Sequence, residues 1–477
     1  MRFICQNARL QPFEPADSRF SLAKIAATIT TWMERWFPDS FVFALLLTVF
    51  VFVASCATGR AAFDIVKDFG DGFWGLVPFT MQMVMVILGG FVMASSPPVR
   101  RLISFLARIP SSARSAVAFV AVVATTTSLI SYGFSLMFSG FLVREISQRP
   151  LKADYRALGA AAYLGLGSVW ALGLSSSAAL MMTTASAIPQ PLLKISGVIP
   201  LSDTIYTWQS VLTAVILILV SVVVAYFSAP TGGSSRTRES LGVAFEPAPA
   251  TAERKTTPAN WLEQTPILTV LIVSLGLSFL AHKISEKGWL SALNLDTYNL
   301  LFLMLGLLFH WRPASFSKAA SEAAPATTGV LIQFPFYAGI FGMISFSPIS
   351  KTFAGLFLKF SNHDTYPVLV SIYSGFLGFF VPSGGGKWMI EAPYVLSAAQ
   401  DLHVSPGWIV QVYNTSEALP NLINPFWMLP LLGILKLKAR DLAGYGLLQL
   451  LVCGPIVLFL MWFLGRTFPV YQPLTPQ

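Results

Sequence analysis

The segment 381-VPSGGGKWMIEAPYV-395 places a proline, a serine and three glycines between apolar stretches, then a lysine and a glutamate four residues apart. Glycine permits strained backbone angles and lets another group approach the backbone closely. Exposed N–H groups at a turn or at the start of a helix attract anions. The segment therefore predicts a broken element that binds an anion, with Lys387 and Glu391 beside it.

The composition around this segment is that of a polytopic membrane protein. Of the 477 residues, 55% are hydrophobic and only 11% are charged, whereas an average soluble domain is about a quarter charged. The formal net charge of +9 does not require a nucleic-acid partner, because basic residues of membrane proteins collect in cytoplasmic loops. The cysteines Cys5, Cys56 and Cys453 have no metal-ligand or redox spacing, so we expect no metal site and no cofactor.

Several apolar stretches are long enough to cross a bilayer as helices, which takes roughly 20 residues. The predicted spans are 40–57, 75–95, 157–187, 208–228, 264–282, 297–310, 327–346, 406–435 and 443–465. Two further apolar stretches, 116–143 and 366–400, are each interrupted in the middle.

These spans divide the chain into two membrane halves. We expect a cytoplasmic N-terminal segment over 1–39, a first half over 40–228, a second half over 264–466 and a short tail over 467–477. The intervening residues 229–263 are charged and rich in Pro, Ser, Thr and Gly, which is typical of a flexible cytoplasmic linker.

Basic loops predict the orientation, because Lys and Arg concentrate on the cytoplasmic side. Both ends of 116–143 are basic, with Arg108 and Arg114 before it and Arg144 and Arg149 after it. This stretch is therefore predicted to be a re-entrant hairpin that enters from the cytoplasm. Following the alternation forward leaves both ends of 366–400 outside, which predicts a second hairpin that enters from the opposite side.

The order span, hairpin, interrupted span, span over 75–228 then recurs upside down over 327–465. Inverted repeats with broken helices that meet near the midplane are typical of secondary transporters. The predicted fold class is an all-α polytopic membrane protein built from inverted repeats with two opposed re-entrant hairpins and interrupted helices. An unrelated run of helices is the alternative.

The first half has a counterpart of the glycine-rich turn in 170-WALGLSSSAALMMTT-184. Gly173 and the serines Ser175, Ser176 and Ser177 interrupt an apolar helix there. Together with Ser383, Gly384, Gly385 and Gly386 they are the predicted substrate-binding backbone and hydroxyl groups. Small residues also let membrane helices pack tightly. That alternative is weaker for the glycines, because packing does not ordinarily need three adjacent ones.

The second interrupted span reads 413-YNTSEALPNLINPFW-427, and its two prolines free backbone carbonyls. Glu417, Asn421 and Asn424 fall at i, i+4 and i+7, which on a helix is one face. Such polar groups inside a membrane are costly unless they line a cavity. We expect them to handle a co-transported proton or cation, with a helix–helix hydrogen-bond patch as the alternative. Asn414 and Gln333 are weaker polar candidates, Asn414 on the substrate side.

Lys387 and Glu391 are four residues apart, so on a helix they face each other. A purely structural ion pair is one interpretation. In the other, Lys387 contacts the substrate anion or stands where another transporter holds a cation, and Glu391 belongs to the ion-coupling group. In either case, removal of one partner is expected to leave a buried, uncompensated charge.

Catalytic patterns are missing from the sequence: no HExxH, P-loop or GxGxxG context is present, and no histidine lies near a serine in an apolar stretch. We therefore expect no catalytic residues and no enzyme. An anion channel remains as a rival, although two opposed hairpins suit alternating access better.

Several long strings carry a family resemblance: 36-WFPDSFVFALLLT-48, 69-FGDGFWGLVPFTMQM-83, 198-VIPLSDT-204, 328-TGVLIQFPFYAGI-340, 381-VPSGGG-386 and 425-PFWMLP-430. Through them the chain resembles the bacterial short-chain fatty acid transporter family. The resemblance implies a multi-pass inner-membrane carrier of acetoacetate, butyrate or a similar small monocarboxylate, coupled to a proton or sodium. A carrier for a different small organic anion is the alternative, and the sequence leaves open whether the chain forms a homo-oligomer.

The resemblance extends residue by residue to Ser383, Gly384, Gly385, Gly386, Glu417 and Asn421. The chain departs from the family at Lys387, where relatives have glutamine or histidine, and at Glu391-Ala392, where they have glutamine-glycine. Opposite charges at 387 and 391 imply that the two changes compensate each other.

Overall fold

The computed structural model describes residues 40–232, 235–245, 257–379 and 381–472. Within these ranges the chain forms helices, turns and loops and no β-strand. The expected cytoplasmic segment 1–39 and the end of the tail, 473–477, lie outside the described residues.

The first membrane half begins and ends with an apolar helix. Its α-helices are α2 (Ser40–Ala57), α3 (Ala62–Phe73), α4 (Val77–Ser95), α5 (Pro97–Leu106), α6 (Ala113–Ser128), α7 (Tyr132–Ser147), α8 (Tyr155–Leu164), α9 (Ser177–Thr183), α10 (Gln190–Ser196) and α11 (Trp208–Ser228). A π-helical turn, Gly165–Val169, and a 3₁₀ turn, Trp170–Leu172, follow α8 and lead to the break before α9.

In the second half, the order of span, hairpin, interrupted helix and span that runs from α4 to α11 recurs from α17 to α23. Its α-helices are α12 (Pro258–Gln264), α13 (Ile267–Lys287), α14 (Trp289–Ala292), α15 (Leu295–His310), α16 (Pro313–Ala323), α17 (Thr328–Ser345), α18 (Ile349–Phe360), α19 (Tyr366–Gly378), α20 (Gly384–Asp401), α21 (Pro406–Ala418), α22 (Leu429–Leu435) and α23 (Ala439–Gly465). A 3₁₀ turn, Leu419–Leu422, extends α21 before its break.

Six helical stretches in the described chain are long and apolar enough to cross a bilayer. They are Val77–Ser95, Tyr155–Thr183, Trp208–Ser228, Ile267–Lys287, Pro313–Ser345 and Ala439–Gly465. All six overlap predicted spans. The predicted spans 40–57 and 297–310 correspond to shorter apolar helices, and 406–435 is divided among shorter helical segments. The predicted hairpins are also present, as the helix pairs α6/α7 and α19/α20.

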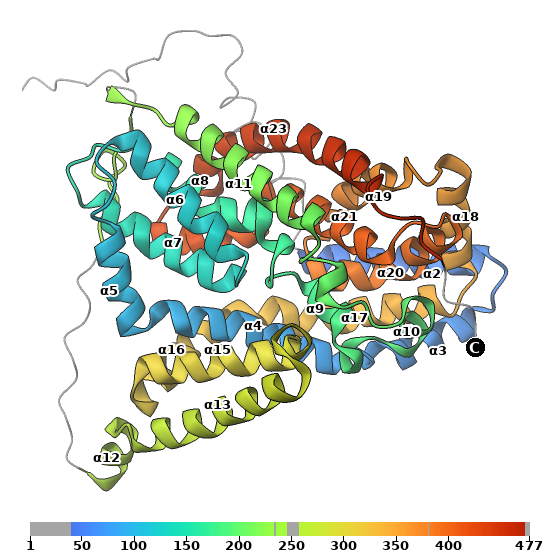
Figure 1. Cartoon of the computed structure of the whole chain (residues 1–477), viewed down its shortest axis with the longest axis horizontal. Helices are drawn as coiled ribbons and strands as arrows, with labels where there is room; N and C mark the ends of the chain where they lie inside the picture. Colours follow the sequence, from blue (N-terminus) through green and yellow to red (C-terminus); the bar gives the residue numbers. More distant parts are fainter. Residues whose placement is uncertain (1–39, 233–234, 246–256, 380, 473–477) are drawn as a thin grey trace, which may run out of the picture.

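The two hairpins enter from opposite ends of the molecule. At one end, Arg149 at the close of α7 donates from Nη1 to the carbonyl of Pro110 just before α6, at 2.7 Å. At the other end, Arg466 after α23 pairs with Asp364 just before α19, at 3.0 Å. Because α23 runs from one end to the other, α6/α7 and α19/α20 are inverted with respect to each other (Figure 1).

The described helices form two groups (Figure 1). We call α6–α9, α11 and α19–α23 the hairpin group, and α2–α4, α13 and α15–α17 the flanking group. Helices within each group pack mainly on one another, except that α20 packs at least as much on α17, α18 and α10. The groups meet through matched pairs: α4 packs on α7, and α17 packs on α20. Each pair joins the first span of a repeat to the second arm of its hairpin.

Part of the predicted linker packs against the first end. Arg236 donates its backbone N–H to Asp154 Oδ2 at 2.9 Å, and Lys436 Nζ donates to the carbonyl of Ala244 at 2.9 Å. The Arg144 guanidinium lies 4.0 Å from the centre of the Phe245 ring. Residues 235–245 therefore gather with the basic loops that follow α7 and α22.

Candidate functional site

Each hairpin tip is held by the break in the interrupted span of its own half. In the first half, Ser175 Oγ accepts from the backbone N–H of Tyr132 at 2.6 Å. In the second half, Trp427 Nε1 donates to the carbonyl of Pro382 at 2.7 Å. Backbone that is irregular at membrane depth needs such partners within the protein. The same arrangement in both halves is the structural basis of the inverted repeat.

The helix α20 begins at the quoted glycine turn because Ser383 caps it. Ser383 Oγ accepts from the N–H of Gly386 at 3.2 Å, which is the usual role of serine at an N-cap. The remaining N–H groups of the first turn have no intrahelical acceptor and carry the positive end of the helix dipole.

The three glycines of this turn are required by packing, which corrects the sequence-based argument. A Cβ on Gly385 would lie 2.6 Å from Phe79 Cζ, and a Cβ on Gly384 or Gly386 would overlap the ring of Trp170 or Tyr337. None of the three glycines has a positive φ. They are needed because aromatic rings lie directly on the backbone of α20.

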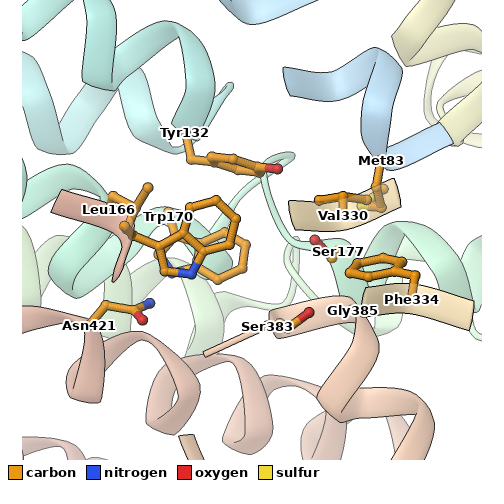
Figure 2. Close-up of a pocket in the computed structure, with 12 residues that line it drawn as sticks. Met83, Tyr132, Leu166, Trp170, Ser177, Val330, Phe334, Ser383, Gly385 and Asn421 are labelled. Carbon is orange, nitrogen blue, oxygen red and sulfur yellow. The ribbon is translucent and has the colours of Figure 1, made fainter. Parts of the chain in front are cut away.

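A small cavity lies where the two hairpin tips, the two interrupted spans, α4 and α17 meet. It is lined by Met83, Tyr132, Leu166, Trp170, Ser177, Val330, Phe334, Ser383, Gly384, Gly385, Asn421 and Trp427. Its volume of about 30 Å³ leaves room for no more than a few water molecules. Figure 2 shows the rings of Tyr132, Trp170 and Phe334 interspersed around the cavity with the polar ends of Ser177, Ser383 and Asn421.

Two residues of the cavity wall carry buried polar atoms that the described protein does not satisfy, Asn421 and, at its indole N–H, Trp170. The Asn421 side chain is 1% exposed, and neither Nδ2 nor Oδ1 has a hydrogen-bond partner among the described residues. A buried amide without partners costs free energy, and such groups call for an explanation. None of the described lining residues is charged, so the polar groups available to a ligand are the Asn421 amide, the Trp170 indole N–H, the Ser177 hydroxyl and the start of α20.

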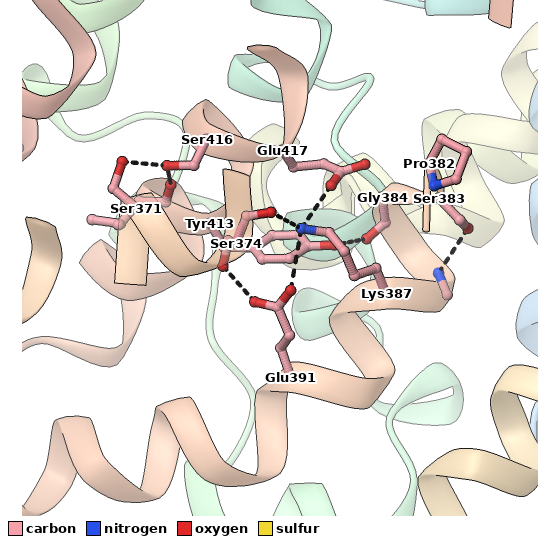
Figure 3. Close-up of polar contacts among 12 residues, drawn as sticks. Ser371, Ser374, Pro382, Ser383, Gly384, Lys387, Glu391, Tyr413, Ser416 and Glu417 are labelled. Atoms are coloured by element: carbon pink, nitrogen blue, oxygen red, sulfur yellow. Dashed lines mark hydrogen bonds and ion pairs between the residues drawn. The ribbon is translucent and has the colours of Figure 1, made fainter. Parts of the chain in front are cut away.

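Lys387 is the centre of a buried charged cluster one turn further along α20. Its Nζ lies 2.7 Å from Glu417 Oε2 and 3.2 Å from Glu391 Oε1. The ammonium also donates to the carbonyl of Ser374 at 2.7 Å. It lies 4.5 Å from the centre of the Tyr413 ring. We call Lys387, Glu391 and Glu417 the buried triad (Figure 3).

The predicted pairing of Lys387 with Glu391 is therefore present, but Glu417 is a second acidic partner that the spacing does not reveal. All three side chains are 0–1% exposed. Ser374 Oγ donates to Glu391 Oε2, and Glu391 Oε1 is in ion-pair contact with Lys387 Nζ. Glu417 Oε1 has no hydrogen-bond partner among the described residues.

The polar residues of the second interrupted span do not share one helical face, because α21 ends at Ala418. Glu417 contacts Lys387, Asn421 lines the cavity, and the Asn424 amide donates to the carbonyl of Phe379 at 3.2 Å. The predicted ion-coupling residues are thus distributed between the buried triad, the cavity and the second hairpin tip.

The other predicted site residues support the cavity from behind. Ser176 caps α9 and donates to Asn414 Oδ1 at 3.0 Å, which ties the two interrupted spans together. Gly173 lies against the backbone of Leu129 at the first hairpin tip. Of the predicted substrate group, Ser177, Ser383, Gly384 and Gly385 reach the cavity.

The aromatic part of the cavity was not predicted as a site. Tyr132 packs edge-on against Trp170, with ring centres 5.4 Å apart, and against Trp427 at 6.0 Å. Trp170 and Trp427 stand inside the two interrupted stretches quoted from the sequence. Their position beside the breaks was the available signal, but apolar rings in an apolar chain do not stand out.

A larger hollow of about 490 Å³ adjoins the cavity. The two share Val330, Phe334, Ser383 and Trp427 as lining residues. The hollow continues between the start of α17 and α22, past Gly329 and Pro430. We call it the vestibule.

Comparison with known proteins assigns this fold and sequence to a transporter group. Residues 21–464 match the model of a family described as "Short chain fatty acid transporter". A relative from Escherichia coli K12 is 35% identical over 91% of this chain and 98% of its own length. One from Haemophilus influenzae is 30% identical over 93% and 100%. Their names describe both, provisionally, as short-chain fatty acid transporters.

Two solved structures share the fold at low sequence identity. The YdaH transporter of Alcanivorax borkumensis superposes with a TM-score of 0.57 at 14% identity, over 91% of this chain and all of that one. MtrF of Neisseria gonorrhoeae, which belongs to a class of antimetabolite efflux pumps, gives 0.52 at 15% identity, over 91% and 97%.

Proposed function

Because the chain belongs to the short-chain fatty acid transporter family, we propose that it carries small monocarboxylates such as acetoacetate and butyrate across a bacterial inner membrane. A carboxylic acid with a pKa near that of Glu, about 4.3, is almost fully ionised at neutral pH. Its anion crosses lipid poorly, so concentrative transport needs a carrier and a coupling ion, either a proton or sodium.

The composition of the cavity wall is the observation that carries this proposal. A short-chain fatty acid has an anionic head and an apolar tail. The cavity combines the first turn of α20 and the Asn421 amide with the rings of Trp170 and Phe334. Ligand sites of this kind are largely apolar with a few placed polar groups.

We assign the substrate carboxylate to Ser177, Ser383, Asn421 and the N–H groups of Gly384 and Gly385. The helix start supplies a partial positive charge and unsatisfied donors. Asn421 Nδ2 can donate a hydrogen bond that the described protein leaves unmade. Ser175, Ser176, Gly173, Gly386 and Asn414 would hold these groups in place and make no contact with the substrate.

Substrate entry requires the cavity to enlarge, because butyrate does not fit into about 30 Å³. The side chains of Val330, Phe334 and Trp427 separate the cavity from the vestibule. Displacement of this partition would join the two spaces. The described conformation then corresponds to a closed state of a carrier, with the partition as its gate.

The test is counterflow of labelled butyrate and acetoacetate in proteoliposomes, which needs no ion gradient. Wild type should exchange label with saturation, and Asn421→Leu and Ser383→Ala should each raise the half-saturating concentration about tenfold or more, as expected for loss of a hydrogen bond to an anion. Ser139→Ala is the matched control: this buried serine of α7 lies outside the cavity and its hydroxyl has no described partner.

Failure of the wild type to exchange either acid, or equal exchange by all variants, would reject this substrate class or this site. Non-saturating anion conductance would instead favour a channel. Exchange of a different small organic anion at higher affinity would keep the carrier and change its cargo.

The orientation is proposed from the distribution of charge. The end of the molecule where Arg149, Arg236 and Lys436 gather is the candidate cytoplasmic side. This places the first hairpin on the cytoplasmic side and the second on the outer side.

A further inference from the structure

We propose that the buried triad binds the coupled ion and that this ion is a proton, accepted by Glu417. The proposal deepens the proposed transport function and rests on it for the link to the substrate. The protonation of Glu417 itself does not depend on the transport function.

The first step is a count of charges. One ammonium faces two carboxylates, so the fully ionised triad of Lys387, Glu391 and Glu417 has a net charge of −1 in a place that is 0–1% exposed. An uncompensated charge in a membrane interior is costly. A bound cation or a proton removes this cost.

The groups around the triad do not supply the missing positive charge. The other ionisable groups that face it in the described structure are phenols, which are neutral at physiological pH. They are Tyr366 and Tyr373 on α19, Tyr394 on α20 and Tyr413 on α21. Lys387 is therefore the sole described cation in the cluster.

The second step excludes a metal cation at this position. Hard cations need several oxygen ligands around them. Glu417 Oε2, Glu391 Oε1 and the carbonyl of Ser374 all face the Lys387 ammonium, at 2.7, 3.2 and 2.7 Å. A sodium ion that used the same oxygens would be repelled by the ammonium a few ångströms away. A proton needs only one lone pair.

The third step locates the proton. Glu391 Oε2 accepts from Ser374 Oγ, and Glu391 Oε1 lies 3.2 Å from the Lys387 ammonium, an ion-pair contact without hydrogen-bond geometry. Glu417 presents one oxygen to Lys387, and its Oε1 has no hydrogen-bond partner among the described residues. Oε1 is thus the oxygen at which a proton adds without displacing a donor.

The last step connects the triad to the cavity. The N–H of Lys387 donates to the carbonyl of the cap residue Ser383 at 2.8 Å. Tyr413, whose ring lies under the ammonium, donates from its hydroxyl to the carbonyl of Gly384 at 2.6 Å. Asn421 lies four residues after Glu417, in the 3₁₀ turn that follows α21. Protonation of Glu417 therefore removes negative charge beside an anion site built on the same two elements, so proton and carboxylate bind with positive coupling.

The sign of the pH dependence follows. Below the pH at which Glu417 titrates, affinity for the anion is constant; above it, the dissociation constant rises up to about tenfold per pH unit, because each anion must take up one proton. By reciprocity, anion binding makes the triad hold its proton more tightly.

The experiment has two independent readouts on the purified full-length protein. Calorimetric titration with butyrate in two buffers of different ionisation enthalpy measures proton uptake per bound anion. Infrared difference spectra between acidic and alkaline buffer detect the carbonyl band of a neutral carboxylic acid without any substrate. Glu322→Gln, which removes an exposed carboxyl on α16, is the control.

Above the pH at which Glu417 titrates, we expect wild type and Glu322→Gln to take up close to one proton per butyrate. Both should be indifferent to replacement of sodium by choline and should show the neutral-acid band in acidic buffer. Glu417→Gln should bind butyrate with pH-independent affinity, without proton uptake, and should lose the band. A sodium requirement without proton uptake, or a neutral-acid band unchanged in Glu417→Gln, would overturn the inference while leaving carboxylate transport intact. Absence of butyrate binding at every pH, with the band still dependent on Glu417, would reject the substrate and retain the proton site.

Discussion

At the scale of single residues, Lys387 determines how charge is distributed in the interior, because its ammonium lies between Glu391 and Glu417. Substitution of Glu391 leaves an ion pair of Lys387 with Glu417, and substitution of Lys387 leaves two carboxylates without a cation. From the spacing of Lys387 and Glu391 alone, substitution of either residue would be expected to have the same effect. The presence of Glu417 makes the two effects unequal.

The stability of variants at these positions should show this inequality. Lys387→Gln is expected to lose about 3–5 kcal/mol, the cost of breaking a buried pair, and Glu391→Gln much less. The double variant should fall between them, because a single carboxylate then remains. Thermal unfolding in detergent and expression level measure the order. Equal loss in both single variants would mean that Glu417 does not share the ammonium.

At the scale of elements, the glycine turn at the start of α20 is the place where aromatic side chains of other helices pack directly on the backbone. Gly385→Ala should cost about 1–3 kcal/mol by overpacking, because the new Cβ would lie 2.6 Å from Phe79 Cζ. Phe79→Leu in the same protein removes the ring and should recover most of the loss. Gly433→Ala on α22, where nothing lies within 4 Å, should be neutral or slightly stabilising.

The measurement is again the midpoint of thermal unfolding, compared among these three variants and wild type. Loss of stability in Gly433→Ala as large as in Gly385→Ala would attribute the effect to glycine in a helix generally, and not to the ring contact.

The elements themselves could be predicted from the sequence, because apolar length decides whether a helix spans and Gly, Pro or Ser clusters mark where it breaks. Both hairpins and the interrupted helices follow from these local signals. Short amphipathic helices such as α3 and α18 could not be predicted in this way, since they are too short to span the membrane. The rings on Gly384–Gly386 come from α4, α17 and the first interrupted span, so no local pattern could reveal them.

The site was predictable to a similar depth. Ser383, Gly384 and Gly385 line the cavity, and they could be predicted because the residues that interrupt the helix there belong to the same short segment. The role of Glu417 depends on where α21 lies against α20, and that depends on tertiary packing. Asn421 and Asn424 diverge because α21 ends at Ala418, which the i, i+4, i+7 spacing assumed it would not.

At the scale of the whole molecule, the inverted arrangement predicts which surface positions share a side of the membrane. In a variant without Cys5, Cys56 and Cys453, a cysteine at exposed Ser240 should react only with permeant thiol reagents in intact cells. One at Val470, which is 66% exposed, should react with impermeant reagents from outside.

The two labelling results separate fold from orientation. Reaction of both cysteines from the same side would contradict the inverted repeat, because 240 lies with the first end of α23 and 470 with the second. Reversed sides would keep the fold and invert the proposed orientation. Mass-tagging of the purified protein after labelling gives the extent at each position.

The bare backbone face of α20 has a mechanical consequence. Phe79 of α4 and Tyr337 of α17 pack ring atoms against Gly385 and Gly386, and these two rings belong to the flanking group while α20 belongs to the hairpin group. Because glycine has no side chain, α20 offers no ridge at these positions that could interlock with grooves of α4 or α17. We therefore expect the two groups to slide past each other at this boundary more easily than interlocked helices would. Glu391 and Glu417 both belong to the hairpin group, so a proton bound there would move together with that group.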